Sequence, residues 1–409
     1  MFPVPGPELT RGLEKFADAL DSACSLRPKH RAALPGVVRQ LSTFLTTDRS
    51  DWPRDYMTRP EYLSAYLRWF MPWNLFRQGI LLQGLGLDLP AGSRIVDLGA
   101  GPLTFLLALW LGRPDLRDRS MEYIAVDRAE PALKAGRDLF SAMTGTATTN
   151  WKVRTERSLA GHGRLPKADL LVAANFLNEL ETSARSSRAG RGSARAGSSD
   201  EDEGIGGGLE DRILVRWQKQ VTSKGAVLLI EPGTRPAGRQ LVRMRRAALE
   251  QGWRVAAPCP HAVECPLPGA RSGAWCHFTF SSEGAPGWLH KLARKVKLPK
   301  ERASLSFLLL TRPDSPISIR PFPRVRQGEG LALVVSEPFE LPDWKQGRYA
   351  CSDRGLLLLE EKSHSNRGAS PAGIRMGGLH PGDVAIVQWP RDLRRDSKSG
   401  ALILPRASR

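Results

Sequence analysis

A short apolar strand that runs directly into a glycine turn most constrains what this chain can fold into. Residues 94–98 form this strand, and Gly99-Ala100-Gly101-Pro102 precedes an apolar helix expected over 103–111. Glycines permit the tight turn and the close approach of a ligand to the backbone. The sequence therefore predicts a strand–turn–helix unit of the kind that opens a nucleotide-binding domain.

Strands and helices continue to alternate beyond this unit. We expect strands over 123–126, 151–153, 170–174 and 226–230, and helices over 131–143 and 239–251. Such alternation produces a parallel sheet joined by right-handed crossovers. Residues 91–312 are therefore predicted to form an α/β domain with a Rossmann-like fold.

The segments around this domain have different patterns. Residues 1–90 have the apolar spacing of helices, and the aromatic stretch 52–76 is interpreted as core packing rather than as a stacking surface for bases. An insert at 183–208 has almost no large apolar residue and is predicted to be disordered. Short strands over 313–395 predict a small β-barrel-like appendage, and residues 396–409 are expected to form a disordered tail.

The net charge of +18 favours a polyanionic partner, because each phosphate that a protein neutralises releases a counterion. We therefore expect a nucleic-acid partner. No apolar run approaches the length of about 20 residues that spans a membrane, so no membrane association is expected. The start of the chain resembles neither a secretory signal nor an organellar presequence, which favours the cytosol, where thiols stay reduced.

An acidic residue, Asp127, follows the second expected strand, 26 residues after Gly101. In dinucleotide-binding folds an acid near this position holds the ribose hydroxyls. The full dinucleotide fingerprint is incomplete, because Thr104 stands where its third glycine belongs. The order Asp97-x-Gly99-x-Gly101 instead resembles the first motif of class I S-adenosylmethionine methyltransferases.

That resemblance implies a cofactor site. It implies that the turn backbone lies along the methionine part of S-adenosylmethionine and that Asp127 holds its ribose. The residues after the fourth strand, Asn175, Phe176 and Asn178, would line the site. The cofactor-binding residues are thus predicted to be Asp97, Gly99, Gly101, Asp127 and Asn175.

The same segment, Asn175-Phe176-Leu177-Asn178, is not the Asn-Pro-Pro-Tyr type of motif that grips an exocyclic amine. Asn178 and Glu179 are interpreted as the cap and start of a helix. No catalytic residue is identified, so the sequence supports a cofactor pocket and leaves open whether the chain is an active enzyme.

Three cysteines lie within 18 residues, in the segment 255–280: Cys259, Cys265 and Cys276. Cysteines followed by proline fit a buried apolar core poorly, so a metal site is favoured. Zinc sites usually contain paired C-x₂₋₄-C knuckles, which are absent here, whereas a 4Fe–4S cluster accepts more varied spacing. Cys351 would be the fourth thiolate and would join the appendage to the α/β domain. His261 and His277 are the spare ligands if the metal is zinc.

Several short motifs together resemble one family, the methyltransferase-like assembly factor of the mitochondrial small ribosomal subunit and its bacterial relatives. The motifs are Asp97–Pro102, Glu231-Pro232-Gly233, Pro258–His261, Cys265-Pro266 and Trp275–Phe278, and the resemblance covers residues 60–390. It implies binding of small-subunit ribosomal RNA or a pre-ribosomal particle, S-adenosylmethionine, and a 4Fe–4S cluster on Cys259, Cys265, Cys276 and Cys351. Gly99 and Gly101 would contact the cofactor.

Three functional hypotheses follow. The first is a monomeric ribosome assembly factor of the bacterial cytoplasm, with a mitochondrial location less favoured. The second is an active S-adenosylmethionine-dependent ribosomal RNA methyltransferase. The third is a zinc-containing methyltransferase that acts on another substrate.

Overall fold

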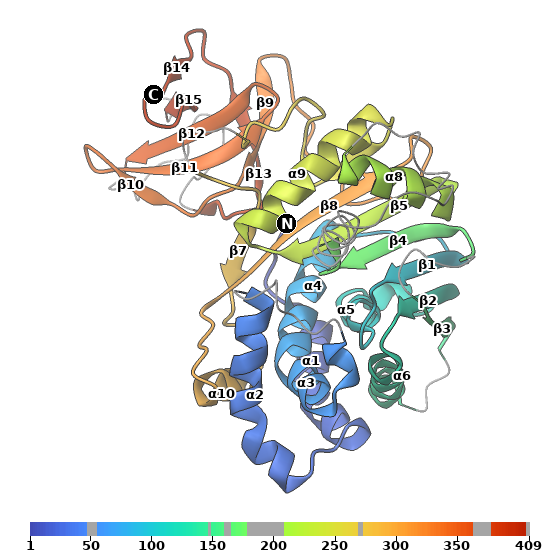
Figure 1. Ribbon diagram of the computed structural model, residues 1–409. Helices are drawn as coiled ribbons and strands as arrows, with labels where there is room; N and C mark the ends of the chain where they lie inside the picture. The colour runs from blue at the N-terminus through green and yellow to red at the C-terminus, as the bar shows by residue number, and fades with distance from the viewer. Residues whose placement is uncertain are drawn as a thin grey trace, which may run out of the picture.

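The computed structural model describes residues 1–46, 55–145, 149–158, 165–177, 208–268, 273–362 and 378–405. A helical N-terminal region, an eight-stranded sheet and a seven-stranded sheet follow one another along the chain (Figure 1). This is the predicted fold class. The expected insert at 183–208 lies outside the described residues apart from Gly208. No helix of the described residues is both long and apolar enough to cross a membrane.

The N-terminal region consists of helices that pack against the rest of the core. They are α1 (Pro7–Ala23), α2 (Pro28–Thr46), α3 (Pro60–Ala65) and α4 (Met71–Leu85), with a 3-10 turn at Tyr56–Thr58 and a π-helical turn at Tyr66–Phe70. Helix α4 is buried on nearly all sides and ends at Gly86, whose φ of +58° is easily adopted by glycine. Trp69, Trp73 and Phe76 are buried, which confirms core packing as their function.

The first sheet has the order β3-β2-β1-β4-β5-β8-β6, and β7 also pairs with β8. Its parallel strands are β1 (Ser93–Leu98), β2 (Met121–Asp127), β3 (Trp151–Arg157), β4 (Ala168–Ala174) and β5 (Val221–Pro232). Strand β8 (Arg302–Thr311) runs antiparallel to β5, and β6 (Arg254–Ala257) and β7 (Phe278–Ser281) run antiparallel to β8. The order of the five parallel strands is that of a Rossmann-like domain, as predicted.

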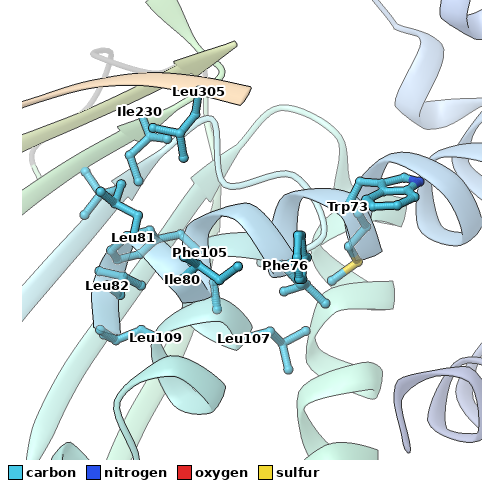
Figure 2. Close-up of a cluster of buried hydrophobic side chains, with 14 of the residues drawn as sticks. Trp73, Phe76, Ile80, Leu81, Leu82, Phe105, Leu107, Leu109, Ile230 and Leu305 are labelled. Atoms are coloured by element: carbon cyan, nitrogen blue, oxygen red, sulfur yellow. The ribbon is translucent and has the colours of Figure 1, made fainter. Parts of the chain in front are cut away.

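Helices cover both faces of this sheet because successive strand residues point to opposite sides. Ile95 and Tyr123 belong to the core on the side of α1, α4, α5 (Thr104–Gly112) and α6 (Glu130–Thr144). Val96 and Ile124 belong to the core on the side of α8 (Leu209–Gln220) and α9 (Arg235–Glu250). Figure 2 shows side chains of α4 and α5 packed together beneath Ile230 and Leu305 of the sheet. Helix α10 (Gly287–Lys295) contacts α1.

The second sheet has the order β13-β9-β11-β12-β15-β14, with β10 paired to β11. The strands are β9 (Glu329–Val334), β10 (Phe339–Leu341), β11 (Lys345–Ser352), β12 (Gly355–Lys362), β13 (Val384–Gln388), β14 (Arg394–Arg395) and β15 (Leu402–Pro405). Its own small core contains Leu357, Leu359, Leu402 and Leu404.

Two expectations about this C-terminal part are wrong. Among the short strands expected over 313–395, the first, at the Ile317-Ser318-Ile319 sequence, is reduced to a single bridge between Ser318 and Asp88. The expected disordered tail at 396–409 contains β15, which pairs in parallel with β12 because Leu402 and Leu404 are buried against it.

Candidate functional site

The glycine turn after β1 is tied to the end of β2. Gly99 and Gly101 have φ angles of +70° and +51°. The Gly99 amide donates to the Val126 carbonyl at 2.9 Å, and the Gly101 amide donates to Asp127 Oδ2 at 2.8 Å. The structure therefore brings together Gly99, Gly101 and Asp127, which the sequence assigned to one site.

Asp127 is well placed to accept further hydrogen bonds. Its other oxygen, Oδ1, accepts from the Ala129 amide at 2.8 Å, and the residue is half-buried. Burial raises the pKa of this carboxyl, while the amides of Ala129 and Gly101 act in the opposite direction. A carboxylate held by two backbone amides in this way retains lone pairs for the hydroxyl groups of a ribose.

Asp97 lies beneath the turn rather than on its surface. It is 1% exposed, and its Oδ2 accepts a hydrogen bond from the Tyr123 hydroxyl at 2.6 Å. Burial raises the pKa of Asp97 to about 7, with a further contribution from the charge of Asp127, although the Tyr123 hydrogen bond lowers it. In this arrangement Asp97 supports the strand end that carries the turn.

The segment after β4 lies directly against the glycine turn. Asn175 has a φ of +58°, and its amide donates to the Ile230 carbonyl of β5 at 2.7 Å. A Cβ atom on Gly99 would lie 2.4 Å from the ring of Phe176. Only glycine therefore fits at position 99. Asn178 and Glu179 lie outside the described residues.

Glu231 is a site residue that the sequence reasoning missed as a functional group. It ends the buried part of β5 with 0% exposure, and its Oε1 accepts from the amides of Phe176 and Leu177 at 2.9 and 2.8 Å. It thereby fixes the segment after β4 to β5. An acidic residue that ends an otherwise apolar strand, as in Leu-Leu-Ile-Glu, is the signal that could have identified it.

The four predicted metal-binding cysteines lie at the junction of the two sheets. Cys259 follows β6, Cys265 lies in the next loop, Cys276 precedes β7, and Cys351 lies in β11. Cys351 is 6% exposed and belongs to the large core against which Cys265 and Cys276 pack. The remaining cysteine, Cys24, lies in the helical region beside Arg68.

These four thiols are close enough to influence one another electrostatically. Burial raises the pKa of Cys351, and the negative charges of Cys265, Cys276 and Cys259 raise it further. Burial raises the pKa of Cys259 to about 11, with a further contribution from Cys265. In the described part of the chain, no three Cys, His, Asp or Glu side chains already stand in a metal-binding arrangement.

Arg245 of α9 is the second residue that the sequence reasoning missed. It is 3% exposed, and its Nη2 donates to the carbonyls of His261 and Val263 at 2.8 Å each. Its positive charge also lowers the pKa of the Cys259 thiol, against the effect of burial. Arg245 therefore holds the loop between Cys259 and Cys265 against α9.

The two candidate histidine ligands differ in their surroundings. Both ring nitrogens of His261 are buried, and neither has a hydrogen-bond partner among the described residues. His277 stacks on Trp275 with a centroid distance of 4.2 Å, and its Nδ1 lies 3.0 Å from the Trp275 carbonyl. Both ring nitrogens of His261 are therefore available to a metal ion, whereas Nδ1 of His277 already has a partner.

Residues 210–334 match the model of the family described as mitochondrial small ribosomal subunit Rsm22. The match extends from α8 to β9 and includes Cys259, Cys265 and Cys276, so the predicted family resemblance is confirmed over this part of the chain. No curated protein sequence matches the chain.

Among solved structures, the chain is similar to methyltransferases from three organisms. A protein of Listeria monocytogenes assigned to the class I S-adenosylmethionine-dependent methyltransferases is 10% identical, with 78% of this chain and 90% of that chain covered and a TM-score of 0.35. The magnesium protoporphyrin IX methyltransferase of Synechocystis is 10% identical, with coverages of 68% and 99% and a TM-score of 0.32. The precorrin-6y C5,15-methyltransferase of Geobacter metallireducens is 14% identical, with coverages of 57% and 86% and a TM-score of 0.31.

Proposed function

We propose that this protein is an assembly factor of the small ribosomal subunit that binds ribosomal RNA, S-adenosylmethionine and a structural 4Fe–4S cluster. One observation carries the proposal: Cys351 of the second sheet lies in the core against which Cys265 and Cys276 of the family-matched segment pack, near enough to Cys259, Cys265 and Cys276 for their charges to raise the pKa of its thiol. The net charge of +18 supports an RNA partner.

The cysteine site suits a positively charged inorganic group. Cys351 is buried and the other three cysteines are half-buried. Thiols whose charges raise one another's pKa become thiolates together when a cationic metal binds them. Cys259, Cys265, Cys276 and Cys351 would hold a 4Fe–4S cluster. Zinc bound by cysteines and His261 is the competing assignment.

Metal analysis of anaerobically purified protein tests the cluster. We expect about four iron and four sulfide ions per chain and little zinc. Cys351→Ser should lose most of the iron, whereas Cys24→Ser, the matched control outside the site, should retain it. Stoichiometric zinc, or equal iron in both variants, would overturn the cluster assignment.

Sedimentation of the tagged full chain in cell lysate tests the ribosomal function. We expect the protein to migrate with small-subunit particles at low salt and to leave them when salt is raised. Migration only at the top of the gradient at every salt concentration would refute this proposal.

An active ribosomal RNA methyltransferase is the second candidate, supported by the intact glycine turn and by Asp127. The cofactor would supply an electrophilic methyl group, while the Gly99–Gly101 turn and Asp127 would bind and orient it. Asp127→Asn should weaken S-adenosylmethionine binding roughly 10–100-fold, the effect of losing a hydrogen bond to a charged group. A methyl mark that is absent from a deletion strain and restored by wild type but not by Asp127→Asn would establish the activity, and an unchanged modification map would reject it.

A further inference from the structure

A small cavity has neither the glycine-turn residues nor the cysteines in its lining. It is lined by Trp73, Arg77, Lys300, Arg302, Ala303 and Ser304 and has a volume of about 40 Å³. Since one water molecule needs roughly 10–15 Å³ on this measure, the cavity holds a group of a few heavy atoms.

The cavity lies at the edge of the sheet where the parallel strands end. Ser304 immediately precedes the part of β8 that pairs with the end of β5, since Leu305 pairs with Pro232. A Cβ atom on Gly233, the residue after β5, would lie 2.8 Å from Ser304 Oγ. The cavity and the glycine turn therefore share one edge of the sheet, where ligands of open α/β sheets bind.

Two half-buried cations lie in the wall of the cavity. Burial lowers the pKa of Lys300 to about 8 and that of Arg77 to about 10, and the charge of Arg77 lowers the pKa of Lys300 further. No carboxylate in the described part of the chain forms an ion pair with either side chain. Lys300 Nζ lies 6.0 Å from the ring centroids of Trp69 and Trp73, at the outer limit of a cation–π contact.

The wall also contains a donor that has no partner among the described residues. Trp73 is 2% exposed, and its Nε1 is buried with no hydrogen-bond partner among the described residues. The Arg77 guanidinium donates to the Ser304 carbonyl at 3.0 Å and to Asn74 Oδ1. Arg302 at the rim is already paired with Glu337. Charges and donors that are partly or wholly removed from water are costly unless a partner satisfies them.

We propose that this cavity binds a phosphate group between Lys300, Arg77 and the indole N–H of Trp73. Phosphate oxygens accept from all three donors and offset both positive charges. Given the proposed function, on which this step rests, the group is a backbone phosphate of ribosomal RNA, which would anchor the RNA at the edge of the sheet that carries the glycine turn.

Thermal unfolding of the full chain in inorganic phosphate, compared with chloride at equal ionic strength, tests the pocket. We expect phosphate to raise the melting temperature of wild type and of Lys291→Gln, a control lysine that is exposed on α10. Lys300→Gln should melt higher than wild type in chloride, because it removes a desolvated charge, and should gain nothing from phosphate. Trp73→Phe, which keeps the ring and removes the donor, should show a weaker phosphate effect. An equal phosphate effect in wild type and Lys300→Gln would overturn the proposal.

Binding of a single-stranded RNA at several salt concentrations identifies the source of the phosphate. Loss of one backbone contact in Lys300→Gln should reduce the slope of log K against log salt by about 0.7, with Lys291→Gln unchanged. RNA binding with an unchanged slope in Lys300→Gln would overturn the backbone assignment. Phosphate stabilisation through Lys300 in a protein that binds no RNA would support the pocket and refute the proposed ribosomal function.

Discussion

Two acidic residues near the glycine turn show how far sequence reasoning extends at the level of single residues. Asp97 and Asp127 both follow from the motif, and both were assigned to the cofactor. The structure places Asp127 at the turn surface and Asp97 beneath it against Tyr123. Asp97 is reached by the Tyr123 hydroxyl, whereas Asp127 is reached by the backbone amides of Gly101 and Ala129, and these contacts are not encoded in the spacing of the motif.

The buried position of Asp97 predicts a pH-dependent contribution to stability. Its pKa is raised from 3.8 to about 7 in the folded protein, so the folded state binds more protons than the unfolded state between these values. The free energy of unfolding should therefore fall as pH rises from about 4 to 7, by at most about 4 kcal/mol at 1.36 kcal/mol per pKa unit. Asp97→Asn should remove this fall, measured by denaturant unfolding at pH 5, 6, 7 and 8.

The pH-dependent part is the readout for Asp97→Asn, because the new amide N–H brings its own cost at every pH. Tyr123 and Asp127 are the titratable groups that act on Asp97, and both remain in the variant. A wild-type pH dependence in Asp97→Asn would show that another group is responsible.

At the scale of elements, helix α9 packs closely against the segment that carries Cys276. A Cβ atom on Gly238 of α9 would lie 2.7 Å from the Cys276 carbonyl oxygen and 2.9 Å from Trp275 Cδ1. Gly238→Ala should therefore push α9 away from the segment that carries Cys276. We expect the free energy of unfolding to fall by roughly 1–3 kcal/mol, as in overpacked cores, which denaturant unfolding measures. We also expect the variant to retain less iron, which iron analysis measures.

Gly36→Ala is the matched control for Gly238→Ala. Gly36 also lies inside a helix, α2, but no atom lies within 4 Å of its added Cβ. Alanine there should stabilise the protein by roughly 0.5–1 kcal/mol through its higher helix propensity. Unchanged iron content in Gly238→Ala would show that the contact between α9 and Cys276 does not shape the metal site.

The elements that the sequence predicted correctly have strong local signals. Strands β1, β2, β4 and the second half of β5 contain apolar runs. In β3, which alternates with charged residues, only the first three residues were predicted. Strands β6 and β7 were not predicted, because each has four residues and exists by pairing with β8. Arg245 and Glu231 were not identified as site residues for a related reason, because their partners are backbone groups of distant segments. Local pattern therefore determines the parallel core, and tertiary pairing determines the rest.

At the scale of the whole molecule, the two sheets are joined at more than one place. The ring of Phe2 stacks on Phe280 with a centroid distance of 4.9 Å and also contacts Phe307. The adjacent Met1 amino group donates to the Gly382 carbonyl of the second sheet at 3.2 Å. Cys351 forms a separate contact between the two sheets, at the cysteine site.

This arrangement predicts how removal of the metal would act on the molecule. Cys351 is the one proposed cluster ligand in the second sheet. Removal of the cluster by a chelator should therefore break the contact between the sheets at Cys351, while the contacts of Met1 and Phe2 persist. We expect faster amide hydrogen exchange in β9, β11 and β12 of the metal-free protein and unchanged exchange in β1, β2 and β4, because only the first set is tied to the cluster. Cys24→Ser should exchange like wild type in both states. Equal protection of β11 with and without metal would mean that the cysteines do not connect the sheets, and the second sheet would then depend on its own core.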